Sequence, residues 1–567
     1  MKADRLLAQY ERIADAPDAV ARLRRFILDL AVRGKLVPQD PNDEPALAAL
    51  AGAKAWLGTR VKEVKRVRWE ASKPIDPAEV DKEVPSGWIS ARVNDTGLYI
   101  NGMAFKPSDW KKSGTPIIRI QNLTDIFKEF NFAEGEFPDE VIVRDGDILV
   151  SWSATLDAFK WTRGTGVLNQ HIFRVIPAPR ITDGAYLLLL LRKAIREMAD
   201  SEHAHGLAMM HINRGPFMAH VVLIPPLPEQ KRIVAKVDEL MALCDQLDKA
   251  RAEREATRDR LAAASLARLN EPDPETFHDD ARFVLNALPA ITARPDQVKQ
   301  LRQTILNLAV RGKLVPQDAN DEPAAELLKG IAMEIAAYSR VNRIGQTAAE
   351  PIPDDDLPFA VPNGWQWTRL CALFNVITDG DHQPPPKADK GVAFLTIGNV
   401  TTGQLNFTGC RLVPEAYFKS LAPYRTPAKG DILYTVVGAT YGRPALVETD
   451  RAFCVQRHIA ILKPVEAMNV RFLMALLASP LIYDQATNST TGTAQPTIAL
   501  RPLRSFLAPL PPLAEQHRIV AKVDELISLC DRLEADLTKS GKVRSRLLGA
   551  LLHEALGPAS SELGFEG

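Results

Sequence analysis

Residues that could bind a metal or act as nucleophiles are scattered along the chain. His203 and His205 form a close pair, but a zinc site needs further ligands at suitable spacing, so the pair is interpreted as surface. The acidic run Asp354–Asp356 stands among prolines and is interpreted as a solvated linker. The sequence contains no G-x-x-x-x-G-K-[ST], H-E-x-x-H or G-x-S-x-G pattern. We therefore expect neither a catalytic site nor a metal or cofactor bound by this chain.

Polar, basic and aromatic residues gather instead in the loops of two long segments, Ser86–Ile224 and Val361–Leu510. Side chains of this kind can reach the phosphates and base edges of DNA. Each one taken singly fits an ordinary solvated loop, and their joint placement favours an interface. The candidate DNA contacts are Lys106, Lys111, Lys112, Arg119, Lys160, Arg163 and His171 in the first segment, and His382, Gln383, Lys387, Tyr441, Arg443, Arg457, His458, Thr493 and Gln495 in the second.

The composition is that of a globular protein, with 46% hydrophobic and 25% charged residues and a formal net charge of zero. The first segment has 15 Lys/Arg against 15 Asp/Glu, and the second has 14 against 9. This basic excess suits phosphate contact, although an uneven surface without function explains it nearly as well. The five cysteines form no C-x-x-C pair, which predicts a reducing cytoplasm rather than a disulfide framework. No apolar run approaches the length of a membrane span, and the first residues lack an apolar signal core.

The elements that must position these loops are repeated. Leu23–Leu47 and Leu301–Ala325 agree at 20 of 25 positions, and Pro225–Asp248 and Pro511–Glu534 agree at 18 of 24. Between these blocks the two halves diverge, apart from short anchors such as Gly-Asp-Ile-Leu at 146–149 and 430–433. Drift after a duplication should spread evenly, so the pattern favours a fixed frame that carries two diverged inserts.

The repeated blocks have helical periodicity. Ile233, Val237 and Leu240 form an apolar seam, which Ile519, Val523 and Leu526 repeat. The first of these helices could run to about Asn270, a length of roughly 60 Å. So long a helix with one apolar stripe needs a partner. We expect its twin to pack antiparallel against it as a rod, although each could instead pack on its own domain.

The other repeated block predicts a helix that ends at a glycine, followed by a turn and a second helix. Because they recur unchanged, its residues cannot distinguish two targets; they hold the frame together or bind a partner present in two copies. The residues assigned to this role, besides the two seams, are Arg33, Gly34, Lys35, Arg311, Gly312 and Lys313.

The diverged segments contain short strand-like runs bounded by Gly, Pro and Asn, followed by a helix, Ala185–Met198 or Val470–Leu477. The predicted fold class is α+β: two mixed, mostly β domains separated by two long antiparallel helices, with an internal pseudo-twofold repeat. The expected segments are helical frame at 1–84, 225–360 and 511–567, and sheet domains at 85–224 and 361–510.

This alternation resembles the specificity subunit of type I restriction-modification systems. The resemblance is carried by Leu-Ala-Val-Arg-Gly-Lys-Leu and by Pro-Pro-Leu-x-Glu-Gln-x-Arg-Ile-Val, each present twice, and by Asp379-Gly380-Asp381-His382 and Gly492-Thr493-Ala494-Gln495. The first sheet domain departs from it at the last two places, with Asn101-Gly102-Met103 and Gly206-Leu207-Ala208-Met209.

The resemblance implies two target-recognition domains that read the halves of a split, asymmetric site in double-stranded DNA. It implies two methyltransferase subunits and two motor-nuclease subunits as partners. S-adenosylmethionine, ATP and Mg²⁺ would then belong to those partners, and the methylated base would be adenine, flipped out of the duplex. Two alternatives stay open: a scaffold without DNA contact, and a divergent fused methyltransferase or nuclease.

Overall fold

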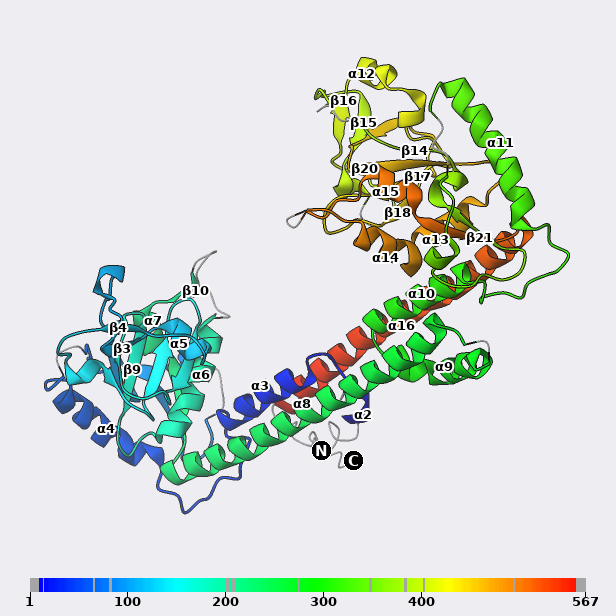
Figure 1. Ribbon diagram of the computed structural model, residues 1–567. Helices are drawn as coiled ribbons and strands as arrows, with labels where there is room; N and C mark the ends of the chain where they lie inside the picture. Colours follow the sequence, from blue (N-terminus) through cyan, green and yellow to red (C-terminus); the bar gives the residue numbers. More distant parts are fainter. Residues whose placement is uncertain are drawn as a thin grey trace, which may run out of the picture. The chain divides into compact units, whose positions relative to one another are not determined.

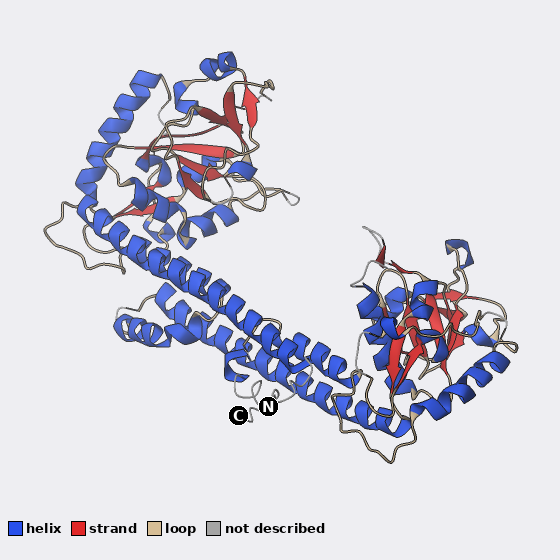
Figure 2. Cartoon of the chain, turned by 180° about the vertical axis from the view of Figure 1, so that it is seen from behind, coloured by secondary structure: helices blue, strands red, loops and turns tan. Residues whose placement is uncertain are grey.

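The computed structural model describes residues 10–13, 15–64, 67–80, 84–199, 204–205, 211–273, 275–345, 349–381, 385–400, 403–492 and 495–556. The chain divides into two compact units, residues 1–253 with 541–567 and residues 254–540. Each unit contains one sheet-rich domain and part of a helical frame (Figure 1 and Figure 2). No helix in the described ranges is long and apolar enough to cross a membrane. The fold class is mixed α+β, as the sequence predicts.

The first sheet domain is closed at its base by β1 (Ile89–Arg92), which pairs antiparallel with β12 (Val221–Ile224). Its central sheet is antiparallel, in the order β2 (Gly97–Asn101), β9 (Ile172–Pro177), β6 (Ile148–Ser151) and β7 (Asp157–Lys160). A second sheet has the order β4 (Asn131–Ala133), β3 (Thr115–Ile118), β8 (Gly166–Leu168) and β5 (Ile142–Val143). Helix α6 (Gly184–Ala199) packs on the central sheet along β7.

The second sheet domain has the same strand order, except that its described residues contain no counterpart of β5. Strands β13 (Gln366–Arg369) and β21 (Leu507–Leu510) close it, and the central sheet has the order β14 (Phe374–Asp379), β20 (Ile459–Pro464), β17 (Ile432–Thr435) and β18 (Pro444–Leu446). The other sheet has the order β16 (Arg411–Val413), β15 (Val392–Leu395) and β19 (Phe453–Val455). Helix α13 (Val470–Leu477) follows, and α14 (Pro480–Asn488) comes next. Two dissimilar sequences therefore build one domain architecture.

The Gly-Asp-Ile-Leu anchors open the central strands β6 and β17. Gly146 and Gly430 have φ of 94° and 91°, a region that disfavours other residues. Asp147 accepts a 2.8 Å hydrogen bond from the Arg144 backbone N–H and pairs with Arg174 at 2.9 Å. Asp431 likewise accepts from a backbone N–H three residues earlier and pairs with the buried Lys463. The anchors persist because each one forms the turn and supplies the partner of a cation of the neighbouring strand.

The frame of the first unit contains α3 (Ala19–Ala31), α4 (Ala46–Arg60) and the start of α8 (Leu227–Asn270). That of the second unit contains α10 (Pro295–Val310), α11 (Ala324–Asn342) and the start of α16 (Leu513–Leu556). Helix α8 ends at the residue that the periodicity predicts. Gly34 and Gly312 follow α3 and α10 with positive φ, and a Cβ there would lie 2.7 and 2.4 Å from a proline of the adjoining sheet domain.

The apolar seam of each long helix packs in a buried cluster of its own unit. Ile233 and Val237 of α8 share one buried cluster with Ile27 and Leu28 of α3. In the second unit, Ile519 and Val523 share a cluster with residues of α10 such as Ile305 and Ala309. At these positions the repeated short helix shares the cluster with the seam, a contact that the periodicity did not predict. Periodicity identifies a buried stripe but not the element that buries it.

Ion pairs reinforce this packing at equivalent positions. Arg24 of α3 contacts Asp245 and Asp248 of α8 at 2.7 and 2.9 Å. Arg302 of α10 contacts Asp531 and Glu534 of α16 at 2.5 and 2.9 Å. The same short helix is thus held on the same face of the long helix in both units.

A second set of repeated contacts joins each sheet domain to its long helix; we call it the domain-helix joint. Trp88 donates to Glu229 at 3.0 Å, and Arg232 pairs with Asp43 at 2.7 Å. In the second unit, Trp365 donates to Glu515 at 2.9 Å, and Arg518 pairs with Asp321 at 2.6 Å. All eight residues belong to the repeated blocks or to the short Pro-x-Gly-Trp anchors. The joint explains why these segments stay alike while the sheet domains diverge.

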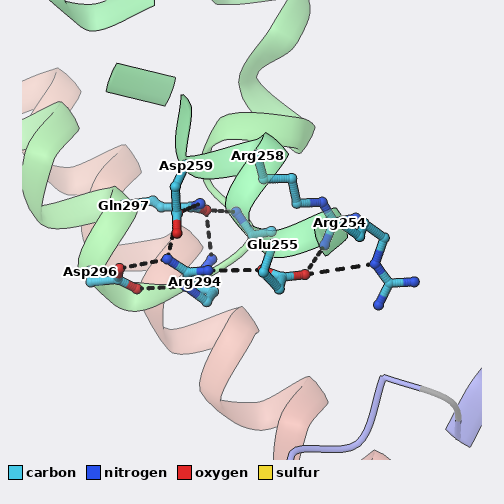
Figure 3. A network of polar contacts seen from close by, with 8 residues as sticks. Arg254, Glu255, Arg258, Asp259, Arg294, Asp296 and Gln297 are labelled. Carbon is cyan, nitrogen blue, oxygen red and sulfur yellow. Dashed lines mark hydrogen bonds and ion pairs between the residues drawn. The ribbon is translucent and has the colours of Figure 1, made fainter. Parts of the chain in front are cut away.

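One contact network breaks the repeat. In the second unit, Arg294 at the start of α10 pairs with Glu255 and Asp259 of α8 at 2.9 and 2.6 Å, and with Asp296 at 2.9 Å. Figure 3 shows these groups converging, with Gln297 donating to Asp259. The positions that correspond to Arg294 and Glu255 in the repeat are Ala16 and Gly541. The network therefore occurs at the contact between α8 and α10 and has no counterpart at the equivalent positions of the first unit.

Candidate nucleic-acid interface

Loops from four strands meet at one end of the central sheet of the first domain. Gly102 N–H donates to the Ile172 carbonyl at 3.3 Å, and Met103 N–H donates to the Leu168 carbonyl at 2.7 Å. Trp152 N–H donates to the His171 carbonyl at 3.3 Å. We call this end the first tip: residues 101–103, 151–154 and 169–171. A Cβ on Gly102 would lie 2.2 Å from the Asn169 carbonyl oxygen, so the close approach requires glycine.

The first tip carries polar atoms that the rest of the domain does not satisfy. His171 has φ of 76°, which is strained for a residue with a Cβ. Its Nδ1, the indole Nε1 of Trp152 and the Oδ1 of Asn169 are buried without a hydrogen-bond partner among the described residues. Strain and unsatisfied polar groups concentrate at sites that bind a ligand. The first tip therefore shares two features with ligand-binding sites, backbone strain at His171 and buried polar atoms without a described partner.

The second domain builds the same end from different residues; we call 379–381, 435–438 and 456–458 the second tip. A Cβ on Gly380 would lie 1.9 Å from the Val455 carbonyl oxygen, as with Gly102. Val436 N–H donates to the His458 carbonyl at 3.1 Å, and Gly438 N–H donates to the Pro496 carbonyl at 2.9 Å. The second of these bonds brings Pro496, which follows the exposed Gln495, to the tip, and Thr497 bridges to Val437 beside it.

The two acidic residues of the second tip each have a hydrogen-bond partner within the domain. Arg425 donates to Asp379 at 2.8 Å, and the Tyr417 hydroxyl donates to Asp381 at 2.9 Å. Burial, together with Asp381, raises the pKa of Tyr417. Arg425 offsets the charge of Asp379, and without it the turn would repel a phosphate backbone more strongly.

His458 of the second tip is half-buried, and this burial, with Arg457 beside it, lowers the pKa of His458. Its Nδ1 lies 3.0 Å from Nε2 of Gln456. Because the amide nitrogen of Gln456 can only donate, Nδ1 is occupied as an acceptor. The remaining ring nitrogen, Nε2, lies 3.4 Å from Nε of Arg457. Exposed Arg457 next to it supplies a positive charge.

An aromatic pair flanks the second tip. The rings of Tyr441 and Tyr483 stack with centroids 5.6 Å apart and an interplanar angle of 7°. The Tyr441 hydroxyl lies 3.0 Å from Oγ1 of Thr487. Gly442, with φ of 81°, lets the turn pass close to the ring of Tyr483 and leaves Arg443 exposed.

The structure brings several predicted contacts to the two tips and leaves others elsewhere. His171, Arg457 and His458 lie at the tips, Gln495 precedes Pro496, which accepts from Gly438 of the second tip, and Tyr441 and Arg443 lie in the adjoining β17–β18 turn. His382, Gln383 and Thr493 lie outside the described residues. Lys106, Lys111, Lys112 and Lys387 are exposed on flanking loops. Lys160 pairs with Ile148 at the opposite end of the sheet from the tip.

Arg119 and Arg163 have contacts inside the first domain. Arg119 donates to Asn131 at 2.9 Å, and its guanidinium lies 4.9 Å from the ring centre of Trp110. Arg163 donates to the Asn122 and Lys128 carbonyls at 3.0 and 3.1 Å. Both side chains brace the loop after β3, and their contact with DNA stays a prediction.

Sequence reasoning missed the asparagine of this loop. Asn122 accepts from the Arg119 N–H at 3.1 Å, and Asn399 accepts from the Thr396 N–H at 2.9 Å. Each asparagine then donates to a carbonyl on the far side of its loop. The signal was present, because Ile-Gln-Asn and Ile-Gly-Asn follow equivalent strands. Arg425, Tyr417 and Tyr483 were also missed, and no sequence pattern marks them.

The predicted frame residues lie outside the tips. The seam residues are buried or half-buried, as described above. Lys35 donates to the Leu556 carbonyl at 2.9 Å, and Lys313 is exposed. Arg33 is half-buried. The Arg311 guanidinium lies 4.2 Å from the ring centre of Phe359, and burial lowers its pKa.

The chain is similar to several known proteins. A family model described as the type I restriction modification DNA specificity domain matches residues 85–255 and 364–540. The specificity subunit of the type I restriction enzyme EcoAI of Escherichia coli is 28% identical over 557 residues, 95% of this chain and 94% of that one. That of EcoEI, from the same organism, is 28% identical over 562 residues, again 95% and 94%. The crystal structure of the HsdS subunit from Thermoanaerobacter tengcongensis aligns with a TM-score of 0.40 and 18% identity, over 84% of this chain and 99% of that one.

Proposed function

The chain belongs to the type I restriction-modification DNA specificity family, and on that premise we propose that its two sheet domains read the two halves of a split, asymmetric DNA site. The chain then directs partner adenine methyltransferase and ATP-dependent restriction subunits to that site and does no chemistry itself. The observation that carries this proposal is one topology with two different tips. Equal scaffolds with different side chains at the same end are what two readers of different sequences require.

The repeated frame supports a partner present in two copies. Leu243 and Leu529 occupy equivalent positions on α8 and α16 and are 47% and 40% exposed. Large apolar side chains exposed at both copies of a repeated segment fit two identical subunits, one on each unit. These subunits are the proposed methyltransferases, and S-adenosylmethionine, ATP and Mg²⁺ are bound by the partners rather than by this chain.

The long helices support fixed spacing between the half-sites. Helices α8 and α16 each continue from one compact unit into the other without a break. A continuous helix transmits a length of about 1.5 Å per residue. We propose that they set the gap between the two half-sites, as the distance between paired modules does in other two-part readers.

The test is a map of N6-methyladenine in the host genome, with and without this gene. Loss of one split motif on deletion is expected. Replacing residues 85–224 by the corresponding domain of another specificity subunit should then change one half of the motif and leave the other half intact. A four-residue deletion within α8 should change the gap and preserve both halves. Changes in both halves after the domain exchange would contradict the assignment of one half-site to each domain.

A further inference from the structure

The loop that joins α5 (Ile120–Thr124) to β4 presents two large apolar side chains to solvent. Ile126 is 68% exposed and Phe127 is 86% exposed. Single exposed hydrophobic residues are ordinary on protein surfaces. Two consecutive large apolar side chains exposed at the apex of a loop forgo the favourable free energy that their burial would supply. Their exposure therefore favours a binding partner that covers them.

The loop is held rigidly in this presentation. Arg163 donates to the Asn122 carbonyl at 3.0 Å and lies 4.3 Å from the ring centre of Phe130. Asn122 donates to the Glu129 carbonyl at 3.1 Å, which closes the loop. At the apex, Phe127 N–H donates to the Asp125 carboxylate at 2.9 Å. These contacts already order the apex in the free protein, so a partner that binds there would lose less conformational entropy on binding.

The second domain keeps the brace and changes the apex. Asn399 donates to the Asn406 carbonyl at 2.9 Å, and the Arg451 guanidinium lies 4.6 Å from the ring centre of Phe407. At its described apex positions stand Gly403 and Gln404. The brace is thus part of the scaffold, whereas the apolar apex belongs to the first domain, as expected of a residue that determines specificity.

The loop begins beside the first tip. Strands β3 and β8 are parallel, and Asn169 of the tip donates from its N–H to the Ile118 carbonyl at 3.0 Å. The chain turns into α5 within two residues of that bond. Exposed Lys128 follows the apex directly and can reach a phosphate. The segment that carries the apex therefore starts next to the first tip.

We propose that Ile126 and Phe127 form an apolar wedge that enters a groove of the DNA at the first half-site and contacts its bases. The wedge rests on the proposed function, because it needs the first tip to face DNA. Apolar side chains act in this way by packing on a thymine methyl group or between base steps. The wedge would make the first half-site depend on an apolar contact that the second half-site lacks.

The experiment uses the whole chain assembled with its methyltransferase subunits and DNA that carries the mapped site. The double variant Ile126→Ala, Phe127→Ala removes only exposed atoms, so folding and assembly should be unchanged. We expect affinity for the site to fall about tenfold, a loss typical of an aromatic contact with a base. The dependence of affinity on salt should keep its slope, because an apolar contact releases no counterion.

Matched variants separate the explanations. Lys128→Ala should reduce the salt slope, and Gln404→Ala in the corresponding loop should change affinity less than about twofold. Unchanged affinity of the double variant would overturn the wedge, and so would loss of assembly with the methyltransferase, which would make the apex a protein contact. A wild-type complex that binds no DNA would overturn the proposed function together with the wedge.

Discussion

Nε1 of Trp88 donates a 3.0 Å hydrogen bond to Oε2 of Glu229, which ties the start of the first sheet domain to the first turn of α8. Both residues are buried, with exposed fractions of 5% and 1%. The equivalent pair, Trp365 and Glu515, makes the same bond at 2.9 Å. The orientation of each sheet domain on its long helix therefore depends on a hydrogen bond between a buried donor and a buried carboxylate. Water cannot reach these groups to replace the bond if it breaks.

Replacing Trp88 by Phe should weaken this joint by about 1–3 kcal/mol, because Glu229 then loses a donor while buried. Hydrogen exchange of peptides that cover β1 and the start of α8 measures the local opening. Trp69→Phe is the control, since Trp69 donates to a backbone carbonyl in a half-buried site that water can reach. Equal effects of the two variants would show that the buried carboxylate is not the cause.

The two joint glutamates should make stability depend on pH. Burial is the largest cause that raises the pKa of Glu229 and of Glu515. A carboxyl whose pKa is higher in the folded protein contributes most stability when protonated, and this contribution falls as pH rises from about 4.3 through the raised value. Glutamine keeps the acceptor for tryptophan and cannot ionise. The double variant Glu229→Gln, Glu515→Gln should therefore gain stability relative to the wild type between pH 4 and pH 7. A pH-independent difference in the free energy of unfolding would contradict this.

Arg294→Ala should loosen the contact between α8 and α10 in the second unit. The arginine has three carboxylate partners but is one-third exposed, so solvent screening limits the loss to about 1 kcal/mol or less. Thermal unfolding at low and high salt measures it, and high salt should shrink the difference between variant and wild type. Lys522→Ala, which removes a pair within one helix turn, should cost less. A salt-independent loss would mean that packing rather than charge is responsible.

Arg425→Gln should weaken DNA binding through the second tip. The substitution leaves Asp379, which is 7% exposed, without its 2.8 Å cationic partner and adds a net negative charge at the surface proposed to meet phosphate. Affinity of the assembled complex for the mapped site should fall about tenfold or more. Adding Asp379→Asn should restore most of it. If the double variant binds as poorly as the single one, then charge balance is not the role of Arg425.

Much of the fold was predictable because local patterns encode it. The heptad seam and the final residue of α8, the glycines after α3 and α10, and the helix Val470–Leu477 all follow from periodicity and turn chemistry. The site was harder. In the sequence, Arg163 and His171 both read as loop residues that could contact DNA. In the structure, Arg163 donates to a carbonyl within its own loop, whereas His171 lies at the first tip with a strained backbone.

The sequence by itself determined the duplicated frame, the two diverged inserts and the family, because identity between repeated blocks is visible without coordinates. Only the tertiary structure decided that α3 and α10 pack in the same clusters as the long-helix seams, and that Asn101, Trp152 and His171 share one tip. A periodic apolar stripe indicates that one face of a helix is buried, but it does not indicate which element packs against that face. The partner, and the meeting of residues far apart in the chain, follow from the register of strands and from how side chains of distant segments fill the same space.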